Sequence, residues 1–416
     1  MEISQEMIDI GQRAKDAARK LAFIGTETKN KALAAMAEAL LQNQDQILSA
    51  NARDVQAAEE KGLRRSLINR LQLTEKKVSE MSEAIRDVIA LPDPVGVGEF
   101  WTRPNGLRIQ KTRVPLGVVA MIYEARPNVT VDAAALSLKS GNACILRGGS
   151  EAIESNKVLA RIIAEAAVKS GCPAGSIQLV DKTDREYALQ LMKMNKYVDV
   201  IIPRGGASLI QTVIENSTVP VIETGTGVCH AFVDKDADLE KAVNIVFNSK
   251  TQKPEVCNAL ETLLVHEDVA ESYLPLIGQK FKDYGVEIRG CEKVRAILPY
   301  AKPAQEEDWS TEYLDLIISI KVVRDLDEAL DHIYKYSTKH SETIITENYT
   351  TAQRFMNEID AAVVYTNAST RFTDGGRFGF GAEIGISTQK LHARGPMALP
   401  ELTTVKYIVY GDGQIV

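Results

Sequence analysis

Residues 116–123, LGVVAMIY, and residues 142–148, NACILRG, decide the class of fold, because both are continuous apolar runs of strand length. A segment with helical periodicity, SEAIESNKVLARIIAEAAVKSG at 150–171, follows the second run. Apolar strands joined by helices predict a parallel sheet that is covered on both faces. The same alternation continues to residue 234, with predicted strands SIQLVD (176–181), VDVIIPRG (198–205), VPVIETG (219–225) and CHAFVD (229–234), and predicted helices DREYALQLMKM (184–194) and GASLIQTVIEN (206–216).

A second α/β unit is predicted to begin at about residue 234. The chain has 416 residues, more than one hydrophobic core usually fills, which favours two domains. The segments that predict the second unit are DLEKAVNIVFNS (238–249), LLVHEDV (263–269), YLDLIISIKVV (313–323), LDEALDHIYKYS (326–337), ETIITEN (342–348) and AAVVYTN (361–367).

The ends of the chain show different patterns. Residues 1–90 have apolar residues at helical spacing, Thr74 is a predicted N-cap, and LPDPVGVG (91–98) ends the helical region. Asn105-Gly106, between two β-prone runs at about 98–114, predicts a hairpin arm. LTTVKYIVYGDGQIV (402–416) is predicted to be another strand pair. These pieces either form a subunit interface or return onto the body of the chain.

Composition and charge exclude several classes of protein. The net charge of −7 argues against a broad nucleic-acid-binding surface. The longest apolar stretch, VPLGVVAMIY, is too short to span a membrane, and the N-terminus lacks the layout of a signal peptide. The five cysteines are scattered without CxxC spacing, which argues against a disulfide framework or a zinc site. We therefore expect a cytoplasmic protein with no metal, no nucleic-acid partner and no membrane span.

Glycine doublets follow two of the predicted strands, in ILRGGSE (145–151) and IIPRGGAS (201–208). Glycines let backbone amides approach phosphate groups, and the N-terminus of a following helix attracts them. The carboxyl ends of parallel strands meet at one edge of a sheet, where ligands bind. With Arg147 and Arg204 beside them, the two doublets favour a nucleotide site, although no GxGxxG fingerprint is present.

Cys257 stands out from the other cysteines, because TQKPEVCNALETLLV (251–265) changes there from polar to apolar. We expect the apolar part to be a helix, with the thiol near its first turn and Lys253 nearby. A helix dipole lowers a thiol pKa by roughly one unit, which raises the thiolate fraction several-fold. Cys257 is therefore a candidate nucleophile, whereas Cys144 and Cys229 fit structural roles. A cysteine-dependent hydrolase or a catalytically idle nucleotide-binding protein remain alternatives at this point.

Seven segments make the sequence similar to a known superfamily. Their order resembles the aldehyde dehydrogenase superfamily over nearly the whole chain, and most of all its gamma-glutamyl phosphate reductase branch, also called the glutamate-5-semialdehyde dehydrogenases. The segments are IYEARPNVT (122–130), ACILRGGSEA (143–152), IIPRGGASLI (201–210), VIETGTG (221–227), KPEVCNALET (253–262), TEYLDLI (311–317) and VRDLDEALDHIYKYSTKHSETI (323–344).

The resemblance implies the fold and its division into domains. The implied fold is aldehyde-dehydrogenase-like α/β, with two doubly wound parallel-sheet domains and a β-arm for oligomerisation. Residues 1–230 would form the dinucleotide-binding domain, interrupted by the arm. Residues 231–385 would form the catalytic domain, and residues 386–416 a C-terminal return with oligomerisation strands.

The resemblance also implies catalytic roles at single positions. Cys257 matches the nucleophile, and Asn128 matches the asparagine whose amide donates to the oxyanion. Glu223 falls where relatives carry a general base. A reductase that starts from an acyl phosphate must protect its thioester from water, so we expect Glu223 to be dispensable for reduction. The sequences around Arg147, Glu223 and Cys257 depart from those of ordinary aldehyde oxidisers, which suits the reductase branch.

Binding residues follow from the same resemblance. Glu312 matches the carboxylate that binds the nicotinamide ribose. Arg147 and Ser150 would lie at the adenosine ribose and its 2′-phosphate, and Gly205 and Gly206 at the pyrophosphate. The substrate carries a carboxylate and a phosphate and therefore needs cationic or hydrogen-bonding partners. The candidates for substrate binding are Arg126, His340, Arg371 and Arg377.

The implied reaction is the NADPH-dependent reduction of L-glutamate 5-phosphate to L-glutamate 5-semialdehyde and phosphate, through a thioester at Cys257, in proline biosynthesis. The alternative is the oxidation of another small aldehyde by the same cysteine chemistry, with NAD or NADP. The resemblance implies a homodimer or a dimer of dimers, and the upstream glutamate kinase is a further candidate partner. The sequence leaves the oligomer size and the preference for NADPH over NADH open.

Overall fold

The computed structural model describes residues 2–416, apart from the side chain of Ser66, and the chain divides into two compact units. The first unit comprises the chain up to Thr224 together with Gly379–Gly385 and Met397–Val416, and the second comprises Gly225–Phe378 and Ile386–Pro396. The chain thus enters the second unit before the predicted boundary at residue 230. The functional labels of the predicted domains stay predictions.

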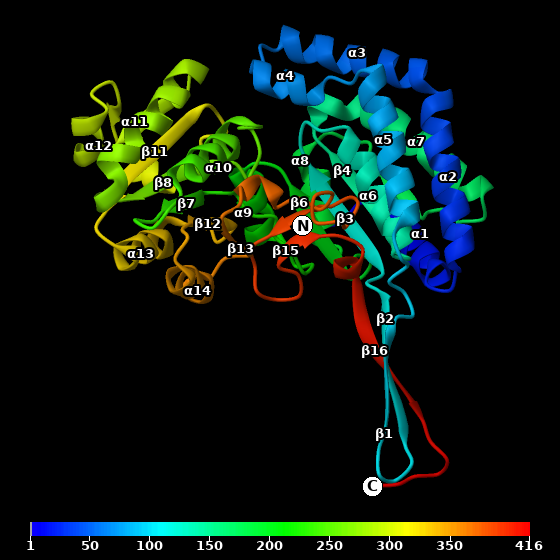
Figure 1. Cartoon of the computed structure of the whole chain (residues 1–416). Coiled ribbons are helices and arrows are strands. Elements are labelled where there is room, and N and C mark those ends of the chain that lie inside the picture. Colours follow the sequence, from blue (N-terminus) through cyan, green and yellow to red (C-terminus); the bar gives the residue numbers. More distant parts are fainter. Residues whose placement is uncertain (1) are drawn as a thin grey trace. The chain divides into compact units, whose positions relative to one another are not determined.

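The first unit is built on a four-stranded parallel sheet with the strand order β5-β4-β3-β6 (Figure 1). All six residues of β3 are buried, as a continuous apolar run predicts. The predicted strand VPVIETG is not formed: Val221 makes only an isolated bridge to Ile201. The strands are β3 (Val118–Tyr123), β4 (Ala143–Gly148), β5 (Ile177–Leu179) and β6 (Val200–Arg204).

Helices of the first unit pack against this sheet and against one another. The predicted helical region is confirmed as α1–α5, and Thr74 caps α5 by accepting a hydrogen bond from the Lys77 N–H at 3.2 Å. The helices are α1 (Gln5–Leu21), α2 (Thr26–Gln42), α3 (Gln44–Glu60), α4 (Arg65–Leu71), α5 (Glu75–Ala90), α6 (Asn128–Lys139), α7 (Ile153–Lys169), α8 (Arg185–Met192) and α9 (Ala207–Asn216), with 3₁₀ turns η1 (Ser150–Ala152) and η4 (Pro400–Leu402).

A three-stranded antiparallel arm extends from the sheet of the first unit (Figure 1). The predicted hairpin is confirmed as β1 (Gly98–Thr102) and β2 (Arg108–Pro115), with Gly106 at φ 86° in the turn. The predicted C-terminal strand pair is wrong, because the tail supplies one strand, β16 (Thr403–Tyr410), which pairs with β2. A third strand explains how the arm is stable, since an isolated hairpin is marginal in water.

The second unit contains a seven-stranded parallel sheet with the strand order β10-β9-β11-β8-β7-β12-β13. The segment CHAFVD, predicted for the first sheet, is instead the inner strand β7 of this sheet. The strands are β7 (Cys229–Val233), β8 (Leu260–His266), β9 (Glu287–Gly290), β10 (Lys302–Pro303), β11 (Ile317–Val323), β12 (Ser341–Ile345) and β13 (Val363–Thr366).

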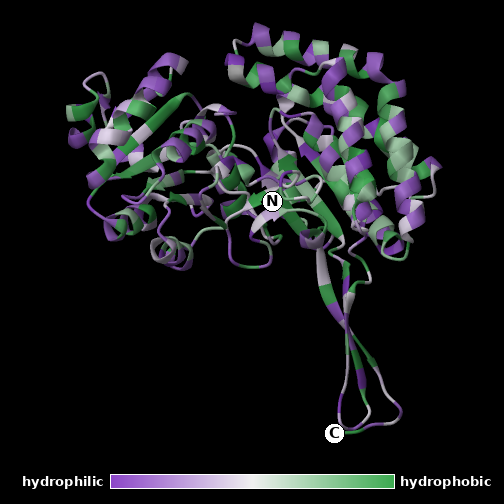
Figure 2. Ribbon diagram, in the orientation of Figure 1, coloured by the Kyte–Doolittle hydropathy of each residue, from purple (hydrophilic) through white to green (hydrophobic). Residues whose placement is uncertain are grey.

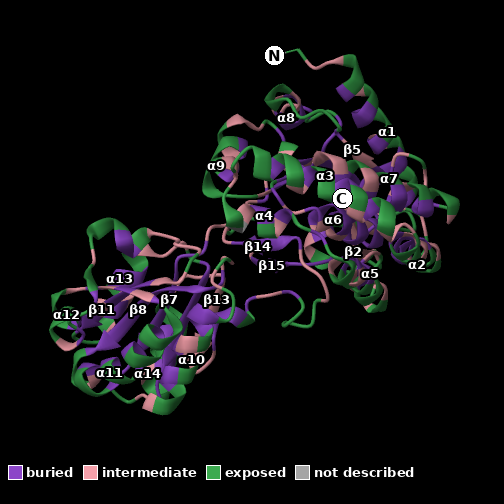
Figure 3. Cartoon of the chain, turned by 90° about the horizontal axis from the view of Figure 1, so that it is seen from above, coloured by how far each residue is buried: buried purple, intermediate pink, exposed green. Residues whose placement is uncertain are grey.

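Apolar side chains of β7 pack on both faces of this sheet, whose strands are largely hydrophobic in Figure 2 and buried in Figure 3. Ala231 and Val233 of β7 join a cluster with α10 and α11, whereas Phe232 joins one with α13 and α14. Helices therefore cover both faces. The remaining elements are α10 (Leu239–Thr251), α11 (Glu267–Tyr284), α12 (Glu292–Ile297), α13 (Leu326–Tyr336), α14 (Tyr349–Glu358), η2 (Glu306–Ser310), η3 (Thr370–Phe372), and the two-stranded ribbon β14 (Gly385–Ser387) and β15 (Gly395–Met397).

The helices and the metal-ligating side chains of residues 2–416 are relevant to two of the classes considered above, membrane proteins and metalloproteins. Among the helices of these residues, none is both long and apolar enough to cross a membrane. Within the same residues, no group of three or more histidine, cysteine, aspartate or glutamate side chains is arranged to hold a metal ion.

A buried histidine on α13 makes the stability of the second unit depend on pH. His332 is 4% exposed, and its ring packs against Trp309, Tyr336 and His230 at centroid distances of 5.3, 4.6 and 5.6 Å. Burial, with the nearby positive charge of Lys321 and other groups, lowers the pKa of His332 to about 2. The folded chain therefore keeps this ring neutral where the unfolded chain protonates it.

We predict that His332→Phe removes part of the loss of stability in acid. The unfolding free energy of the wild type falls by about 1.4 kcal/mol for each pH unit below the unfolded-state pKa of about 6.5, because unfolding lets His332 bind a proton. The variant binds no proton at this position. Between pH 7.5 and pH 5, the difference in unfolding free energy should shift by about 2 kcal/mol in favour of the variant. Urea unfolding at both pH values measures it, and a constant difference would contradict the prediction.

Candidate active site

The strand order of the first sheet defines a ligand crevice. From β3 the chain runs outward through β4 and β5, then returns to the other side of β3 with β6. Ligands of open α/β sheets bind at the carboxyl ends of the strands where the order reverses. Glu124 after β3 and Gly205–Gly206 after β6 lie at this point, and the Glu124 N–H donates to the Arg204 carbonyl at 3.1 Å.

Gly206 presents a backbone amide to an anionic oxygen at the start of α9. Its N–H donates to Glu124 Oε2 at 3.0 Å, so a carboxylate stands where an oxygen of a pyrophosphate would accept. A Cβ on Gly205 would lie 2.5 Å from the same Glu124 oxygen, at the end of an exposed side chain. The residues present therefore fit a dinucleotide pyrophosphate, provided that Glu124 gives way to it.

Arg147 and Ser150 lie at the carboxyl end of β4, as the parallel-strand pattern predicts. The guanidinium of Arg147 donates from Nη2 to the Thr183 carbonyl at 2.9 Å, and burial lowers its pKa. The side chain thereby ties β4 to the loop before α8. Ser150 is exposed and lines a cavity of about 650 Å³ in the first unit.

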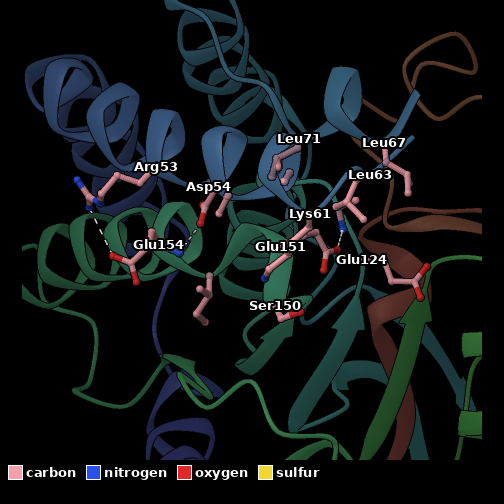
Figure 4. A pocket seen from close by; sticks show the side chains of 14 residues that line it. Arg53, Asp54, Lys61, Leu63, Leu67, Leu71, Glu124, Ser150, Glu151 and Glu154 are labelled. Carbon is pink, nitrogen blue, oxygen red and sulfur yellow. Dashed lines mark hydrogen bonds and ion pairs between the residues drawn. The ribbon is translucent and has the colours of Figure 1, made fainter. Parts of the chain in front are cut away.

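This cavity lies between α3, α4 and the loop after β4 (Figure 4). Its apolar wall comes from α3, α4, the segment between them, Ala125 and Ile153. The charged lining residues are Arg53, Asp54, Lys61, Glu124, Glu151 and Glu154. Glu151 accepts a hydrogen bond from the Ala125 N–H at 2.5 Å, and Ala125 has a φ of 38°, which is unusual for a residue other than glycine. The apolar lining is Ala57, Ala58, Leu63, Leu67, Leu71, Ala125 and Ile153.

Asn128 is the first residue of α6, and its side chain is oriented by Asp132 one turn later. Asn128 Nδ2 donates to Asp132 Oδ2 at 2.9 Å. Burial raises the pKa of Asp132 to about 6, against the effect of this hydrogen bond. An amide nitrogen has two hydrogens, so Asn128 can donate one to Asp132 and still offer the other to a ligand.

Cys257 does not lie on a helix. It sits in a turn between the end of α10 and the start of β8, and the apolar run LETLLVH that was predicted to be helical is the buried strand β8. Short apolar runs cannot be assigned to helix or strand by periodicity alone. A helix dipole that begins at this position therefore cannot activate the thiol, and that part of the sequence argument is wrong.

Backbone contacts hold the Cys257 turn against the start of β7. The Cys229 thiol donates to the Cys257 carbonyl at 3.2 Å. A Cβ on Gly227 would lie only 1.5 Å from that carbonyl oxygen. Glycine is thus the only residue that lets the two segments approach so closely. The Gly227 N–H donates to Glu312 Oε1 at 2.7 Å, so the Cys257 turn and the Glu312 carboxylate meet at one residue.

Asn258 fixes the same turn from the other side. Its Nδ2 donates to the Thr373 carbonyl at 2.7 Å, and its Oδ1 accepts from the guanidinium of Arg371. Arg371 also donates to Gln252 Oε1 at 2.9 Å and is only 7% exposed. Arg371 therefore holds the turn through these contacts, and its predicted contact with the substrate stays a prediction.

Comparisons with known proteins agree with these features. A family model described as "Aldehyde dehydrogenase family" matches residues 4–305. The gamma-glutamyl phosphate reductases of Desulfitobacterium hafniense (strain Y51) and Moorella thermoacetica are 72% and 62% identical to this chain over 416 residues, with complete coverage of both chains in each case. The chain belongs to the aldehyde dehydrogenase family, in its gamma-glutamyl phosphate reductase branch.

Solved structures of aldehyde dehydrogenase family members show the same fold. The gamma-glutamyl phosphate reductase of Thermotoga maritima matches with a TM-score of 0.96 at 52% identity, covering 99% of this chain and 100% of that one. An acetylating aldehyde dehydrogenase from Geobacillus thermoglucosidasius matches with a TM-score of 0.73 at 19% identity, covering 99% and 98%. The second likeness concerns the fold alone.

Three other side chains predicted to bind substrate, and the predicted general base Glu223, differ in their surroundings. His340 is fully buried, with Nδ1 at 2.8 Å from Ser341 Oγ and 3.8 Å from Cys229 Sγ. Arg377 is exposed, and Arg126 and Glu223 are half-buried. The contacts of these four side chains do not test their predicted roles in the aldehyde dehydrogenase mechanism.

Reasoning from the sequence missed several residues that shape this aldehyde dehydrogenase site. Asp132 could have been found, because a carboxylate at i+4 from Asn128 lies on the same helix face. Gly227 and Asn258 could not, since their importance depends on contacts with segments far away in the chain. Glu124 was quoted within IYEARPNVT, but nothing in the sequence placed it at the amide of Gly206.

We predict that Gly227→Ala displaces the Cys257 turn. Moving the Cys257 carbonyl away from the added Cβ should lower the unfolding free energy by about 1–3 kcal/mol. It should also change the rate at which iodoacetamide alkylates Cys257, followed by mass spectrometry. Gly25→Ala is the matched control, because a Cβ at Gly25 meets nothing within 4 Å. Equal behaviour of the two variants would contradict this account of Gly227.

Proposed function

We propose that the chain reduces L-glutamate 5-phosphate to L-glutamate 5-semialdehyde and phosphate with NADPH, through a thioester at Cys257, as a step of proline biosynthesis. The observation that carries this proposal is the full-length similarity to proteins named gamma-glutamyl phosphate reductase. The family itself points to a nicotinamide cofactor and to a cysteine nucleophile. The turn that holds Cys257 beside Glu312 supports the assignment.

Cys257 acts as the nucleophile in the proposed reaction. Its thiolate attacks the acyl carbon of the substrate, the C–O bond to phosphate breaks, and inorganic phosphate leaves with the electron pair. The bound cofactor supplies the hydride that reduces the resulting thioester. Collapse of the tetrahedral alkoxide then breaks the C–S bond, which releases the semialdehyde and restores the thiolate without any net uptake of a proton at Cys257.

Asn128 stabilises the oxyanion in this proposal, and Asp132 positions Asn128. The hydrogen bond from Asn128 Nδ2 to Asp132 fixes the rotamer of the amide, so that its second N–H keeps one direction. One preorganised donor to an oxyanion is typically worth about 10²–10³ in rate. The backbone N–H of Cys257 is the second donor that we propose.

Five residues are proposed to bind the cofactor. Gly205 and Gly206 would bind the pyrophosphate in place of the Glu124 carboxylate, and Glu312 would bind the nicotinamide ribose. Arg147 and Ser150 remain the residues proposed for the 2′-phosphate. Lys61 lines the same cavity as Ser150, but Asp54, Glu124, Glu151 and Glu154 line it too, so its lining holds more negative than positive side chains.

Arg126 and Arg377 remain the proposed cationic partners of the substrate. His340 is proposed with less direct access, because its ring lies in the interior of the second unit. The substrate is an acyl phosphate, so a kinase that phosphorylates glutamate must supply it. That upstream kinase is a proposed partner.

The decisive experiment runs the reaction in reverse, with semialdehyde, phosphate and NADP⁺, and follows the absorbance of the reduced nicotinamide. We expect turnover that depends on inorganic phosphate and is abolished in Cys257→Ser. In the forward direction, Glu223→Gln should lose less than about a hundredfold, because reduction needs no base to activate water. Turnover without phosphate would indicate oxidation of an aldehyde by water, and thiol-dependent turnover without any nicotinamide would indicate a hydrolase.

We further propose that the β-arm binds a second copy of the chain. It exposes an apolar surface that a monomer would leave in water, with Phe100 66% exposed and Tyr407 60% exposed. The exposed apolar residues of the arm are Phe100, Trp101, Val405, Tyr407, Val409 and Tyr410.

We predict that Phe100→Lys weakens self-association by about tenfold, because a charge replaces a large aromatic side chain at the interface. Sedimentation velocity over a range of protein concentrations measures the dissociation constant. Tyr334→Lys is the control, because Tyr334 is 83% exposed but lies on α13, outside the arm. An unchanged dissociation constant for Phe100→Lys would exclude the arm face around Phe100 from the interface.

A further inference from the structure

A buried ion pair lies in the second unit, formed by residues on either side of Cys257. Lys250 is near the end of α10 and Glu261 is the second residue of β8, and Lys250 Nζ lies 2.6 Å from Glu261 Oε2. Both side chains are 0% exposed. Burial lowers the pKa of Lys250 and raises the pKa of Glu261 to about 8. Such a pair rarely adds stability over apolar residues of the same size, so another role has to be sought.

The second oxygen of Glu261 reaches the segment that carries Glu312. Glu261 Oε1 accepts a hydrogen bond from the Leu314 N–H at 3.3 Å. Leu314 has a φ of 53°, in the left-handed region that a leucine rarely adopts. A strained conformation persists only where neighbouring groups hold it. The Glu261 carboxylate is one such group.

Tyr313, between Glu312 and Leu314, is held as well. Its hydroxyl lies 2.9 Å from Asp308 Oδ1 and 2.6 Å from Ser319 Oγ. The ammonium of Lys250 lies 5.9 Å from the centroid of the Tyr313 ring. The Lys250–Glu261 pair therefore contacts two successive residues of the segment 312–314.

Glu312 itself is fixed at its carboxylate by the Gly227 N–H at 2.7 Å. One end of the segment is thus hydrogen-bonded, through the Glu312 carboxylate, to Gly227 beside the Cys257 turn. The other end is hydrogen-bonded to the ion pair through the Leu314 N–H. The direction of the Glu312 side chain depends on both attachments, because each one restricts the backbone from which that side chain projects.

We propose that Glu261 is a positioning residue for the cofactor: through the Leu314 N–H it sets the backbone of Glu312, and the hydrogen bond from Lys250 to the other carboxyl oxygen keeps Glu261 oriented for that contact. This inference rests on the proposed function, in which Glu312 binds the nicotinamide ribose. It assigns the buried pair to binding of the cofactor and not to the chemistry at Cys257.

Two double variants separate the hydrogen bond from the charge. Lys250→Met with Glu261→Gln removes both charges but keeps an oxygen that can accept from Leu314. Lys250→Met with Glu261→Met removes the oxygen as well, with side chains of similar length. Both should fold, because a buried pair can be replaced by neutral side chains of similar volume. The single variants would leave one charge buried without its partner and are less informative.

We expect the Gln double variant to bind NADP⁺ within about threefold of the wild type. The Met double variant should bind it at least about tenfold more weakly, since the partly buried Leu314 N–H loses its acceptor. Isothermal titration calorimetry with NADP⁺ measures both. The KM for L-glutamate 5-phosphate and the rate of alkylation of Cys257 without cofactor should not change. A general loss of structure would move all of these readouts together.

Glu312→Gln, added to the wild type and to the Met double variant, tests whether the effect passes through Glu312. We expect a loss of NADP⁺ affinity in the wild type and a much smaller further loss in the Met double variant, because the carboxylate is already misplaced there. Additive losses, or wild-type NADP⁺ affinity in the Met double variant, would overturn the inference. Absence of NADPH-dependent reduction by the wild type would instead overturn the proposed function, since the binding measurements need no turnover.

Discussion

The close approach of the Gly227 and Cys257 backbones is the constraint on which the second half of the site depends. No side chain fits between the two segments, because a Cβ on Gly227 would lie 1.5 Å from the Cys257 carbonyl oxygen. The same glycine donates its N–H to Glu312. Gly227 therefore fixes the distance between the Cys257 turn and the Glu312 carboxylate, which we propose to bind the nicotinamide ribose.

Buried polar groups surround this contact and account for its rigidity. Asn258 and Arg371 bond the turn from one side, and the Cys229 thiol bonds it from another. Each buried donor or acceptor that loses its partner costs about 1–3 kcal/mol, so the network resists rearrangement. The reactivity that we propose for Cys257 would have to come from this environment, because no helix begins at the thiol. Lys253 is exposed and therefore contributes a screened charge.

In the first unit, a backbone amide at the carboxyl ends of the strands forms a hydrogen bond with an anionic side chain. Its strand order brings the carboxyl ends of β3 and β6 together, and the amide of Gly206 points at a carboxylate there. Glu124 occupies the position that we assign to a pyrophosphate oxygen. In the proposed complex a dinucleotide would replace one anion by another at the same amide, so that the N–H would have an acceptor before and after binding.

The sequence by itself determined the parallel α/β class, the helical N-terminal region, the hairpin at Asn105-Gly106 and, through its motifs, the family. Local periodicity and turn chemistry are written in neighbouring residues, which is why these features could be predicted. Tertiary structure decided that LETLLVH is a strand, that CHAFVD belongs to the second sheet, and that Arg371 holds the Cys257 turn. Strand pairing and side-chain contacts join residues far apart in the chain, such as Asn258 and Arg371, which are 113 positions apart. The local pattern of a single sequence does not show which distant residues come together.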